Sequence, residues 1–390
     1  MNSPNFSSTS ITGYGSSLQL SRPLQQFLRA SDPVLKLYNQ SWTFEAWIYP
    51  TNLSNGNTYV IVAQCDVGRN LTCFHIIIRS QKLYFGQFND DASGTKILTP
   101  LRWYHVGFTF ECDTRNMSIY LDGLLDTSQQ LKFCFQGVNQ PLTVGVNPAW
   151  SSYFDGLIDE LYYTNRTKTA DEILRDATLT VHFSFDNNST YDQGPLRING
   201  SLVGNTTFVP GRAGQALEIR NESQSYFRVP GMVLLGASDR SYSFCIWIRP
   251  KVQQKAIIIH TSSLSNGSGW DFPILRITQA YQLASYSWNG TLMTATGPVI
   301  PADSWTHAAV TYSLLNGLKL YANGTLSNAS VPFSYNPSGV PLYLFVGSSL
   351  SSTEWGTGTN KSNQYCGAVD ELGVYSRELS IGEITHLANP

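Results

Sequence analysis

The chain has 390 residues and an almost balanced charge, with 25 lysines and arginines against 27 aspartates and glutamates. This length exceeds what one hydrophobic core usually organises, so we expect two domains. The sequence has no run of Lys or Arg, which argues against nucleic acid as a partner. It also has no apolar run of the roughly 18 residues that a membrane-spanning helix needs, so no membrane span is expected.

Short apolar and aromatic segments follow one another along the first half of the chain. The earliest long one is Ser41-Trp-Thr-Phe-Glu-Ala-Trp-Ile-Tyr-Pro50, and Trp103-Tyr-His-Val106 follows it. The pair Asp122-Gly123 lies between two apolar runs, as a tight β-hairpin turn requires. The series ends in Gly156-Leu-Ile-Asp-Glu-Leu161 and then in Thr169-Ala-Asp-Glu172, a capping box that predicts a short helix.

The second half repeats these segments in the same order. Residues 241–250 match residues 41–50 at an offset of 200, and the turn pair recurs as Asn323-Gly324 at 201. The ending recurs at 211 as Gly367-Ala-Val-Asp-Glu-Leu372, followed by a second capping box, Ser380–Glu383. A shared order with nearly constant spacing indicates two copies of one fold.

The local pattern within each copy is typical of β-strands. Residues 306–312, 318–321 and 343–347 are short, rich in β-branched or aromatic residues, and bounded by Gly, Asn or Pro. We therefore predict an all-β protein of two tandem antiparallel β-sandwich domains, over residues 10–176 and 178–390, each closed by a short capped helix.

Six cysteines and many glycosylation sequons favour an oxidising, extracellular compartment. The sequence contains 16 Asn-x-Ser/Thr sequons, and the candidates include Asn39, Asn70, Asn116, Asn165, Asn205, Asn266, Asn289, Asn323 and Asn360. Because the first residues show neither a basic region nor an apolar run, no signal peptide is visible. We expect a secreted protein or ectodomain whose leader is not part of this sequence.

The positions of the cysteines predict three disulfides. Cys65 and Cys73 enclose a short Gly-containing loop, and Cys112 and Cys134 flank the predicted Asp122-Gly123 hairpin. Cys245 and Cys366 then remain as the third pair. Their counterparts in the first copy are Glu45 and Asp155, so both cysteines are replaced together.

The repeated Asp-Glu pair can have a structural role, or it can bind a metal or take part in catalysis. Alternate residues of a strand share a face, so Asp159 and Asp370 lie on apolar-looking faces and need partners there. If Cys245 faces Cys366, the same registry places Asp370 opposite Ser241 and Asp159 opposite Ser41. Hydrogen bonding to such donors is the expected structural role. A Ca²⁺ site is the alternative, whereas catalysis is disfavoured because adjacent strand residues point to opposite faces.

The repeated elements resemble laminin-G-like domains of the concanavalin A-like lectin/glucanase superfamily, which implies a jelly-roll fold. The matching elements are Phe-x-x-Trp-Ile-x-Pro, Trp-x-His, Tyr-x-Asp/Asn-Gly and Gly-x-x-Asp-Glu-Leu followed by a capped helix. The second copy also has Val181-His-Phe-Ser-Phe-Asp186 and Gly211-Arg-Ala-Gly214, which resemble the opening strands of the family. The first copy lacks these opening strands, so we expect it to be truncated or completed by its neighbour.

No catalytic motif is recognisable, so we predict that the chain is not an enzyme. The glucanase relatives carry Glu-x-Asp-x-x-Glu on one strand, but the nearest stretch here, Glu111–Asn116, ends in Asn. His105 and His307 occupy matching strand positions, where a histidine satisfied within the core is the expected reading. The sequence also lacks Gly-x-Ser-x-Gly, His-Glu-x-x-His and Cys-x-x-Cys.

Calcium is the one cofactor that the residues suggest, and none is required. The family topology would bring the opening strands of the second copy near its closing strand. Asp370, Asp186 and Glu218 are therefore candidate ligands. The first copy has Gln19 where the second has Glu218 and lacks the Phe-Asp segment, so a site is expected in the second copy alone.

Exposed aromatic side chains are the candidates for a ligand-binding face. Trp150 and Tyr153 in the first copy and Trp355 in the second fall in equivalent loops before the last strand, although packing over the sandwich edge is an alternative for each tryptophan. We expect a non-enzymatic extracellular recognition or adhesion protein that binds a glycan or a matrix protein. The alternatives are a structural spacer in a larger ectodomain and an accessory module of a glycoside-processing enzyme.

Overall fold

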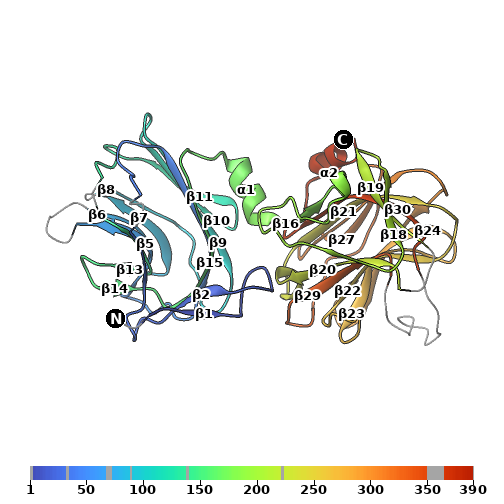
Figure 1. The fold of residues 1–390 in the computed structure, drawn as a ribbon, viewed down its shortest axis with the longest axis horizontal. Helices are drawn as coiled ribbons and strands as arrows, with labels where there is room; N and C mark the ends of the chain where they lie inside the picture. Colours follow the sequence, from blue (N-terminus) through green and yellow to red (C-terminus); the bar gives the residue numbers. More distant parts are fainter. Residues whose placement is uncertain are drawn as a thin grey trace. The chain divides into compact units, whose positions relative to one another are not determined.

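The computed structural model describes residues 3–31, 35–66, 73–87, 90–137, 140–220, 224–348 and 364–389. The chain divides into two compact units, Met1–Ala177 (unit 1) and Thr178–Pro390 (unit 2) (Figure 1). Unit 1 also takes in a strand at residues 5–7, which lies before the predicted start of the first domain. Trp355, Asn70 and Asn360, which the sequence nominated, lie outside the described residues.

Unit 1 is a sandwich of two antiparallel sheets (Figure 1). The first sheet has the strand order β1 (Asn5–Ser7), β2 (Ser17–Leu20), β15 (Gly156–Thr164), β4 (Trp42–Pro50), β9 (Tyr104–Glu111), β10 (Asn116–Leu121) and β11 (Leu124–Gln130). The second has the order β3 (Leu28–Ala30), β12 (Leu142–Val144), β5 (Thr58–Cys65), β6 (Cys73–Arg79), β7 (Lys82–Gln87) and β8 (Asp90–Ser93). A small hairpin, β13 (Val146–Asn147) and β14 (Ser152–Tyr153), contacts β5.

Unit 2 repeats this arrangement. Its first sheet has the order β18 (Thr206–Pro210), β19 (Gln215–Ile219), β30 (Gly367–Tyr375), β21 (Tyr242–Pro250), β26 (Thr306–Ser313), β27 (Gly317–Ala322) and β28 (Thr325–Ala329), and β16 (Leu179–Phe183) also pairs with β30. Its second sheet has the order β17 (Ser201–Val203), β20 (Tyr226–Met232), β29 (Leu342–Val346), β22 (Ala256–Ser262), β23 (Asp271–Ile277), β24 (Gln282–Trp288) and β25 (Leu292–Val299). The predicted fold class is confirmed.

The core of each unit lies between its two sheets and is rich in aromatic rings. In unit 1, Trp42 packs against Phe44, Phe74 and Phe85 with ring centroids 5.2–5.5 Å apart. These rings come from both sheets, so they join the two layers, and edge-to-face packing adds to the free energy gained by burial. Because side chains alternate along β4, Glu45, the residue after Phe44, points to the opposite face of the sheet.

The predicted helices and turns are present. Helix α1 (Ala170–Thr178) follows Thr169, and α2 (Ile381–Leu387) follows Ser380, whose side chain forms a complete capping box with Glu383. Each helix packs on the outer face of its first sheet and buries one isoleucine, Ile173 or Ile384. The described residues contain no helix that is both long and apolar enough to cross a membrane.

Two of the three predicted disulfides are present, and the third is wrong. Cys65 is bonded to Cys73 and Cys112 to Cys134, but Cys245 and Cys366 are free. Cys245 lies within β21 opposite Gly373, whereas the carbonyl of Cys366 accepts a hydrogen bond from Lys251 N beyond the end of β21. At about 3.4 Å per residue, the two cysteines are therefore roughly 20 Å apart along the sheet.

The predicted registry of the Asp-Glu strands is also wrong, because it assumed that Cys245 faces Cys366. Asp370 lies opposite Trp247, and Asp159 lies opposite Trp47, so neither aspartate faces the serine that was expected. Both strands contain a bulge at this point. The following glutamates, Glu160 and Glu371, have left-handed backbone angles, with φ of 47° and 49°. The repeated Asp-Glu pair therefore marks a β-bulge in the closing strand of each unit.

Candidate functional site

The two repeated aspartates fasten a turn between two early strands onto the closing strand. Asp370 is fully buried, and its Oδ2 accepts hydrogen bonds from the backbone N–H groups of Arg212 and Ala213 at 2.8 and 3.1 Å. Its Oδ1 accepts a bond from Glu371 N at 2.9 Å. Burial nevertheless raises the pKa of Asp370 to about 7. Asp159 is held similarly, by Ile11 N at 2.9 Å and Glu160 N at 3.0 Å. The expected structural hydrogen bonding is therefore present, with backbone donors in place of serines.

The three carboxylates nominated for calcium each have protein partners. Asp186 accepts a hydrogen bond from Gln215 N at 2.7 Å, on the turn that Asp370 also holds. Glu218 lies 3.6 Å from Arg220 and 3.8 Å from Lys251. Across the described part of the chain, no three His, Cys, Asp or Glu side chains are gathered as a metal site would require. Calcium binding stays a prediction.

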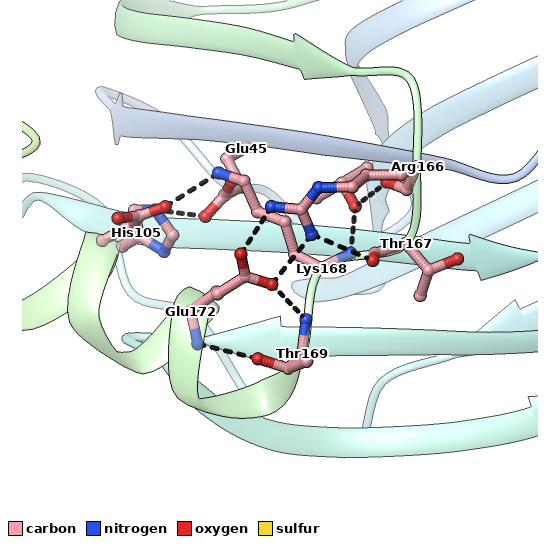
Figure 2. Close-up of polar contacts among 9 residues, drawn as sticks. Glu45, His105, Arg166, Thr167, Lys168, Thr169 and Glu172 are labelled. Atoms are coloured by element: carbon pink, nitrogen blue, oxygen red, sulfur yellow. Dashed lines mark hydrogen bonds and ion pairs between the residues drawn. The ribbon is translucent and has the colours of Figure 1, made fainter.

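A buried polar cluster, which we call the unit 1 seat, lies beneath helix α1. It consists of Glu45, His105, Lys168 and Asp176. Lys168 Nζ forms ion pairs with Glu45 and, at 2.8 Å, with Asp176. Glu45 Oε1 lies 3.6 Å from His105 Nε2, and both side chains are 3% exposed. Figure 2 shows Glu45, His105 and Lys168 of the seat, beside the Arg166–Glu172 ion pair and the capping contact between Thr169 and Glu172.

The surroundings of the unit 1 seat shift the pKa values of its ionisable groups. Burial raises the pKa of Glu45 although Lys168 opposes this shift. Burial also lowers the pKa of His105 to about 3, so the imidazole is neutral at physiological pH. Burial lowers the pKa of Lys168, but the hydrogen bonds and the negative charges of Asp176 and Glu45 together raise it above its usual value. Lys168 compensates the charge of Glu45. His105 is buried as expected, but its Nδ1 has no hydrogen-bond partner, so the histidine is not satisfied within the core as the sequence predicted.

The corresponding place in unit 2, the unit 2 seat, is apolar. It consists of Cys245, Ala309, Tyr321, Leu379 and Ile384. Burial raises the pKa of the Cys245 thiol to about 12 and lowers that of the neighbouring His307 to about 4. A small hollow of about 100 Å³ lies beside Cys245 and is lined in part by His182, Glu371 and His386. The thiol is therefore protonated and unreactive in the folded protein.

A row of aromatic and charged side chains crosses the outer face of the second sheet of unit 1. We call it the aromatic row: His75 and Arg79 on β6, Tyr84 on β7, Asp91 on β8, and Trp150 at the tip of the β13–β14 hairpin. The Trp150 ring lies 4.8 Å from the His75 ring, and Arg79 Cζ lies 4.5 Å from the Tyr84 ring and 5.9 Å from that of Trp150. Trp150 is 50% exposed.

Local backbone structure fixes the aromatic row. Tyr84 Oη donates a 2.5 Å hydrogen bond to Asp91, and burial, followed by this bond, raises the pKa of Tyr84 to about 12. Gly86 leaves room for its neighbours, because a Cβ there would lie 2.3 Å from His75 Nε2. The fully buried Asn147 accepts from Ala149 N at 2.9 Å and so holds the turn that carries Trp150.

His75 is the unusual member of the row. It is 5% exposed, neither ring nitrogen has a hydrogen-bond partner, and burial lowers its pKa to about 3. The neutral imidazole lies between the rings of Tyr84 and Trp150, with both ring nitrogens unpaired. The charged groups of the row, Arg79 and Asp91, lie farther out on the same face, where they can contact the polar edge of a ligand.

A hollow of about 290 Å³ lies on the other side of the β13–β14 hairpin, over β3, β12 and β5. Its lining includes Tyr153, together with Arg29, Gln140, Thr143 and Ser151. The hairpin thus carries both residues that the sequence nominated in unit 1. Trp150 belongs to the aromatic row and Tyr153 to the hollow, so the structure places them on neighbouring parts of one face.

Sequence reasoning singled out the loop that carries Trp150 and Tyr153, but it missed the row beside this loop. His75, Arg79, Tyr84 and Asp91 lie on three different strands, and each looks unremarkable in its own segment. The available signal was the Ser80-Gln81 turn between two alternating runs, which pairs Ile77 with Tyr84. Among the nominated sequons, the asparagines at 39, 116, 165, 266, 289 and 323 are exposed and Asn205 is half-buried. Their glycosylation stays a prediction.

Comparison with solved structures returns matches at low sequence identity. Domain 4 of AbnA, an extracellular arabinanase from Geobacillus stearothermophilus solved with arabinotriose, is 22% identical with a TM-score of 0.38, and the match covers 54% of this chain and 98% of that one. The binding domain of Paraclostridial Mosquitocidal Protein 1 is 15% identical with a TM-score of 0.42, and coverage is 55% and 52%.

The binding domain of botulinum neurotoxin serotype G is 14% identical with a TM-score of 0.41, and coverage is 54% and 50%. The chain therefore spans about half the length of each toxin domain. A search among proteins of curated function finds no significant match.

The family comparison covers most of the chain. The model of the concanavalin A-like lectin/glucanases superfamily, of the laminin G type, matches residues 25–174 and 220–385. The two matched ranges fall in unit 1 and unit 2, in agreement with the resemblance seen in the sequence. The chain belongs to this superfamily and carries its fold twice.

Proposed function

We propose that the chain is a non-enzymatic extracellular recognition protein and that unit 1 binds a glycan through the aromatic row. The observation that carries this proposal is the half-exposed Trp150 ring, fixed against His75 and beside Arg79. An exposed ring of this kind packs on the apolar face of a sugar, and the flanking charged groups can bond its hydroxyls. The hollow at Tyr153 supplies an adjacent place for a second sugar unit.

Two further observations support the extracellular, non-enzymatic reading. The disulfides Cys65–Cys73 and Cys112–Cys134 are typical of chains that fold in oxidising compartments. The repeated aspartates of the closing strands accept hydrogen bonds from backbone N–H groups of the early turns, which gives them a structural role. A glycosidase would instead need two separated carboxyl groups that flank a cleft.

Binding of the purified chain to a broad panel of glycans and matrix proteins tests the proposal. We expect retention on a subset of glycans, with affinity lowered at least about tenfold, or ~1.4 kcal/mol, by Trp150→Ala. Tyr191→Ala is the matched control, because this aromatic side chain in unit 2 is 71% exposed. The glycan affinity of Tyr153→Phe tests whether the hollow contributes to binding, and that of Arg79→Gln tests whether the charge of Arg79 contributes.

Each other outcome identifies a competing function. Retention on matrix proteins alone, unaffected by Trp150→Ala, would move recognition away from the aromatic row. Silence across the panel would support a structural spacer. Turnover of a glycan by the pure protein, lost in Asp370→Asn or Glu371→Gln, would show that the chain is an enzyme.

A further inference from the structure

One charged side chain lines the hollow beside the β13–β14 hairpin. Arg29 on β3 lies opposite Thr143 on β12, and Thr143 lies opposite Ala63 on β5. Because Leu142 and Val144 belong to the core of unit 1, alternation points Thr143, and Arg29 with it, to the outer face of the sheet. Arg29 is exposed, and it is the only charged residue among the described residues that line the hollow.

The Arg29 guanidinium has no carboxylate partner within the described ranges of the chain. Asp66 follows Cys65, which lines the hollow, but Asp66 itself is not part of the lining. The planar fork of an arginine binds a carboxylate through two parallel hydrogen bonds. Arg29 therefore presents an anion-binding group that the fold itself does not use.

An arginine recurs at the same register position in unit 2. Thr143 of β12 and Phe345 of β29 are equivalent, because each lies two residues before a left-handed glycine whose N–H donates to β5 or to β22. Arg228 lies opposite Phe345, as Arg29 lies opposite Thr143. The two units thus allow a direct comparison of one arginine in two settings.

The surroundings of the two arginines differ. In unit 2, Arg228 Nη1 donates to the carbonyl of Ser265 at 3.3 Å. The buried rings of Phe345 and His260, with centroids 6.2 Å apart, cover the sheet beside it. The corresponding residues of unit 1 are a threonine and an alanine, so a hollow of about 290 Å³ is left beside Arg29. The hollow therefore results from small residues in unit 1 where unit 2 has rings.

The rest of the lining suits a sugar ring. Tyr153, Gln140 and Ser151 supply polar groups, and Phe27 and Pro148 supply apolar surface. A volume of this size lies at the lower end of ligand pockets, which begin near about 300 Å³, so the hollow suits one sugar unit better than a longer chain.

We propose that the hollow binds a sugar unit that carries a carboxylate, and that Arg29 pairs with this carboxylate. The inference rests on the proposed glycan binding by unit 1, and it names the class of sugar in the second place. The ring of Trp150 holds the neighbouring unit of the same glycan. An acidic glycan is thus bound across the β13–β14 hairpin, with one sugar unit on each side.

Two pairs of probes that differ in charge test the proposal on the full chain. They are sialyllactose with lactose, and trigalacturonate with the same trisaccharide after reduction of its carboxylates to alcohols. We expect the acidic member of at least one pair to bind at least about tenfold more tightly in calorimetry. Arg29→Gln should remove this preference and leave the affinity for the neutral member unchanged. Arg29→Lys keeps the charge without the fork, so it should restore only part of the preference.

Arg228→Gln is the matched control, and we expect it to leave the affinity for every probe unchanged. Because Arg29 is exposed and has no described carboxylate partner, Arg29→Gln should also leave the melting temperature unchanged within error. Salt at about 1 M should weaken binding of the acidic probe and not of the neutral one.

Trp150→Ala separates this inference from the proposed function. If wild type shows no acidic preference while Trp150→Ala weakens both members of a pair, the inference fails and glycan binding by the aromatic row stands. If the preference depends on Arg29 and Trp150→Ala changes no affinity, the hollow binds the acidic sugar and the aromatic row does not take part.

Three further results would overturn the proposal. The first is an acidic preference that Arg29→Gln retains. The second is an equal loss of affinity in Arg228→Gln, which would place the ligand elsewhere. The third is tighter binding of sulfated lactose than of sialyllactose with the same dependence on Arg29, because the hollow would then select a sulfate and not a carboxylate.

Discussion

The side chains beneath the two closing helices differ in kind, because the unit 1 seat is charged and the unit 2 seat is apolar. Their frames are the same: Thr43 Oγ1 donates to the carbonyl of Arg166 and accepts from Lys168 N, and Ser243 Oγ does the same with Arg377 and Leu379. Within these frames, Glu45 and Lys168 of unit 1 correspond to Cys245 and Leu379 of unit 2. The ion pair has been exchanged as a pair.

The comparison shows that the frame, and not the buried pair, determines the fold at this point. Two buried charges lose their hydration, and mutual attraction repays this cost only in good geometry. A thiol and a leucine have no such cost. We therefore expect each pair to depend on both members, while the exchange of the whole pair is tolerated.

Removal of one member of the ion pair should have the largest effect. Lys168→Met leaves Glu45 buried without its cation, and we expect a loss of about 3–5 kcal/mol in the free energy of unfolding of unit 1. The pKa of Glu45 is already raised in the folded chain, so protonation relieves the charge. The deficit of the variant should therefore shrink as the pH falls toward the folded pKa. Hydrogen exchange of unit 1 peptides during denaturation measures both effects.

Exchange of the whole pair should recover part of this loss. We expect the double variant Glu45→Cys with Lys168→Leu to lose roughly 2 kcal/mol less free energy of unfolding than the sum of the losses of the two single variants. The reverse exchange in unit 2, Cys245→Glu with Leu379→Lys, is the matched test. Additive single effects in both units would contradict the idea that the frame accepts either pair.

Asp370, which holds the early turn of unit 2, should make the stability depend on pH. The folded pKa of Asp370 is raised to about 7 by burial, so the folded state holds a proton that the unfolded state has released. The stability of the wild type relative to Asp370→Asn should thus be highest below about pH 4 and fall as the pH rises through 7. Paired melting curves from pH 4 to 8 measure this difference, and a constant difference would contradict the shift.

The same variants test calcium. If Asp370 and Asp186 bind it, calcium should raise the melting temperature of the wild type, and Asp370→Asn should reduce this rise while Asp159→Asn preserves it. Equal melting temperatures in calcium and in chelator would leave the aspartates with structural roles alone.

The arginines beside the two capping boxes should give the smallest effects. The Arg166 side chain is 54% exposed, so Arg166→Gln should leave the melting temperature unchanged within error. Its counterpart Arg377 is 23% exposed and also donates to Thr178 Oγ1 at 3.1 Å. Arg377→Gln should therefore cost about 1 kcal/mol. Equal effects at both positions would mean that these additional contacts contribute nothing.

The fold was predictable because its signals are local. Turns such as Asp122-Gly123, the capping boxes and the short alternating strands each specify backbone structure within a few residues. Registry was not predictable from the strand pattern, because the pattern does not determine which residues of two strands pair; the bulge at Glu371 shifts the pairing by only one residue. The assumption that Cys245 pairs with Cys366 then carried the error to Asp370 and Ser241.

The candidate site was only partly predictable. Trp150 and Tyr153 were found because a tryptophan and a tyrosine in a loop are conspicuous. His75, Tyr84 and Asp91 become neighbours only when three strands pair, so no segment of sequence contains the row. The buried partners of Glu45 were hidden for the same reason, since Lys168 lies 123 residues away along the chain.

The position of the closing strand has a consequence for synthesis on the ribosome. In unit 1, β15 lies between β2 and β4, and Asp159 bonds to Ile11 across 148 residues. The sheet cannot be completed until almost the whole unit has been translated, because its central strand is made last. During that interval β2 and β4 expose unpaired, apolar edges, the condition under which nascent chains aggregate. We expect ribosome-bound chains that end before Gly156 to require chaperones, and chains that extend past Thr178 to be released from them.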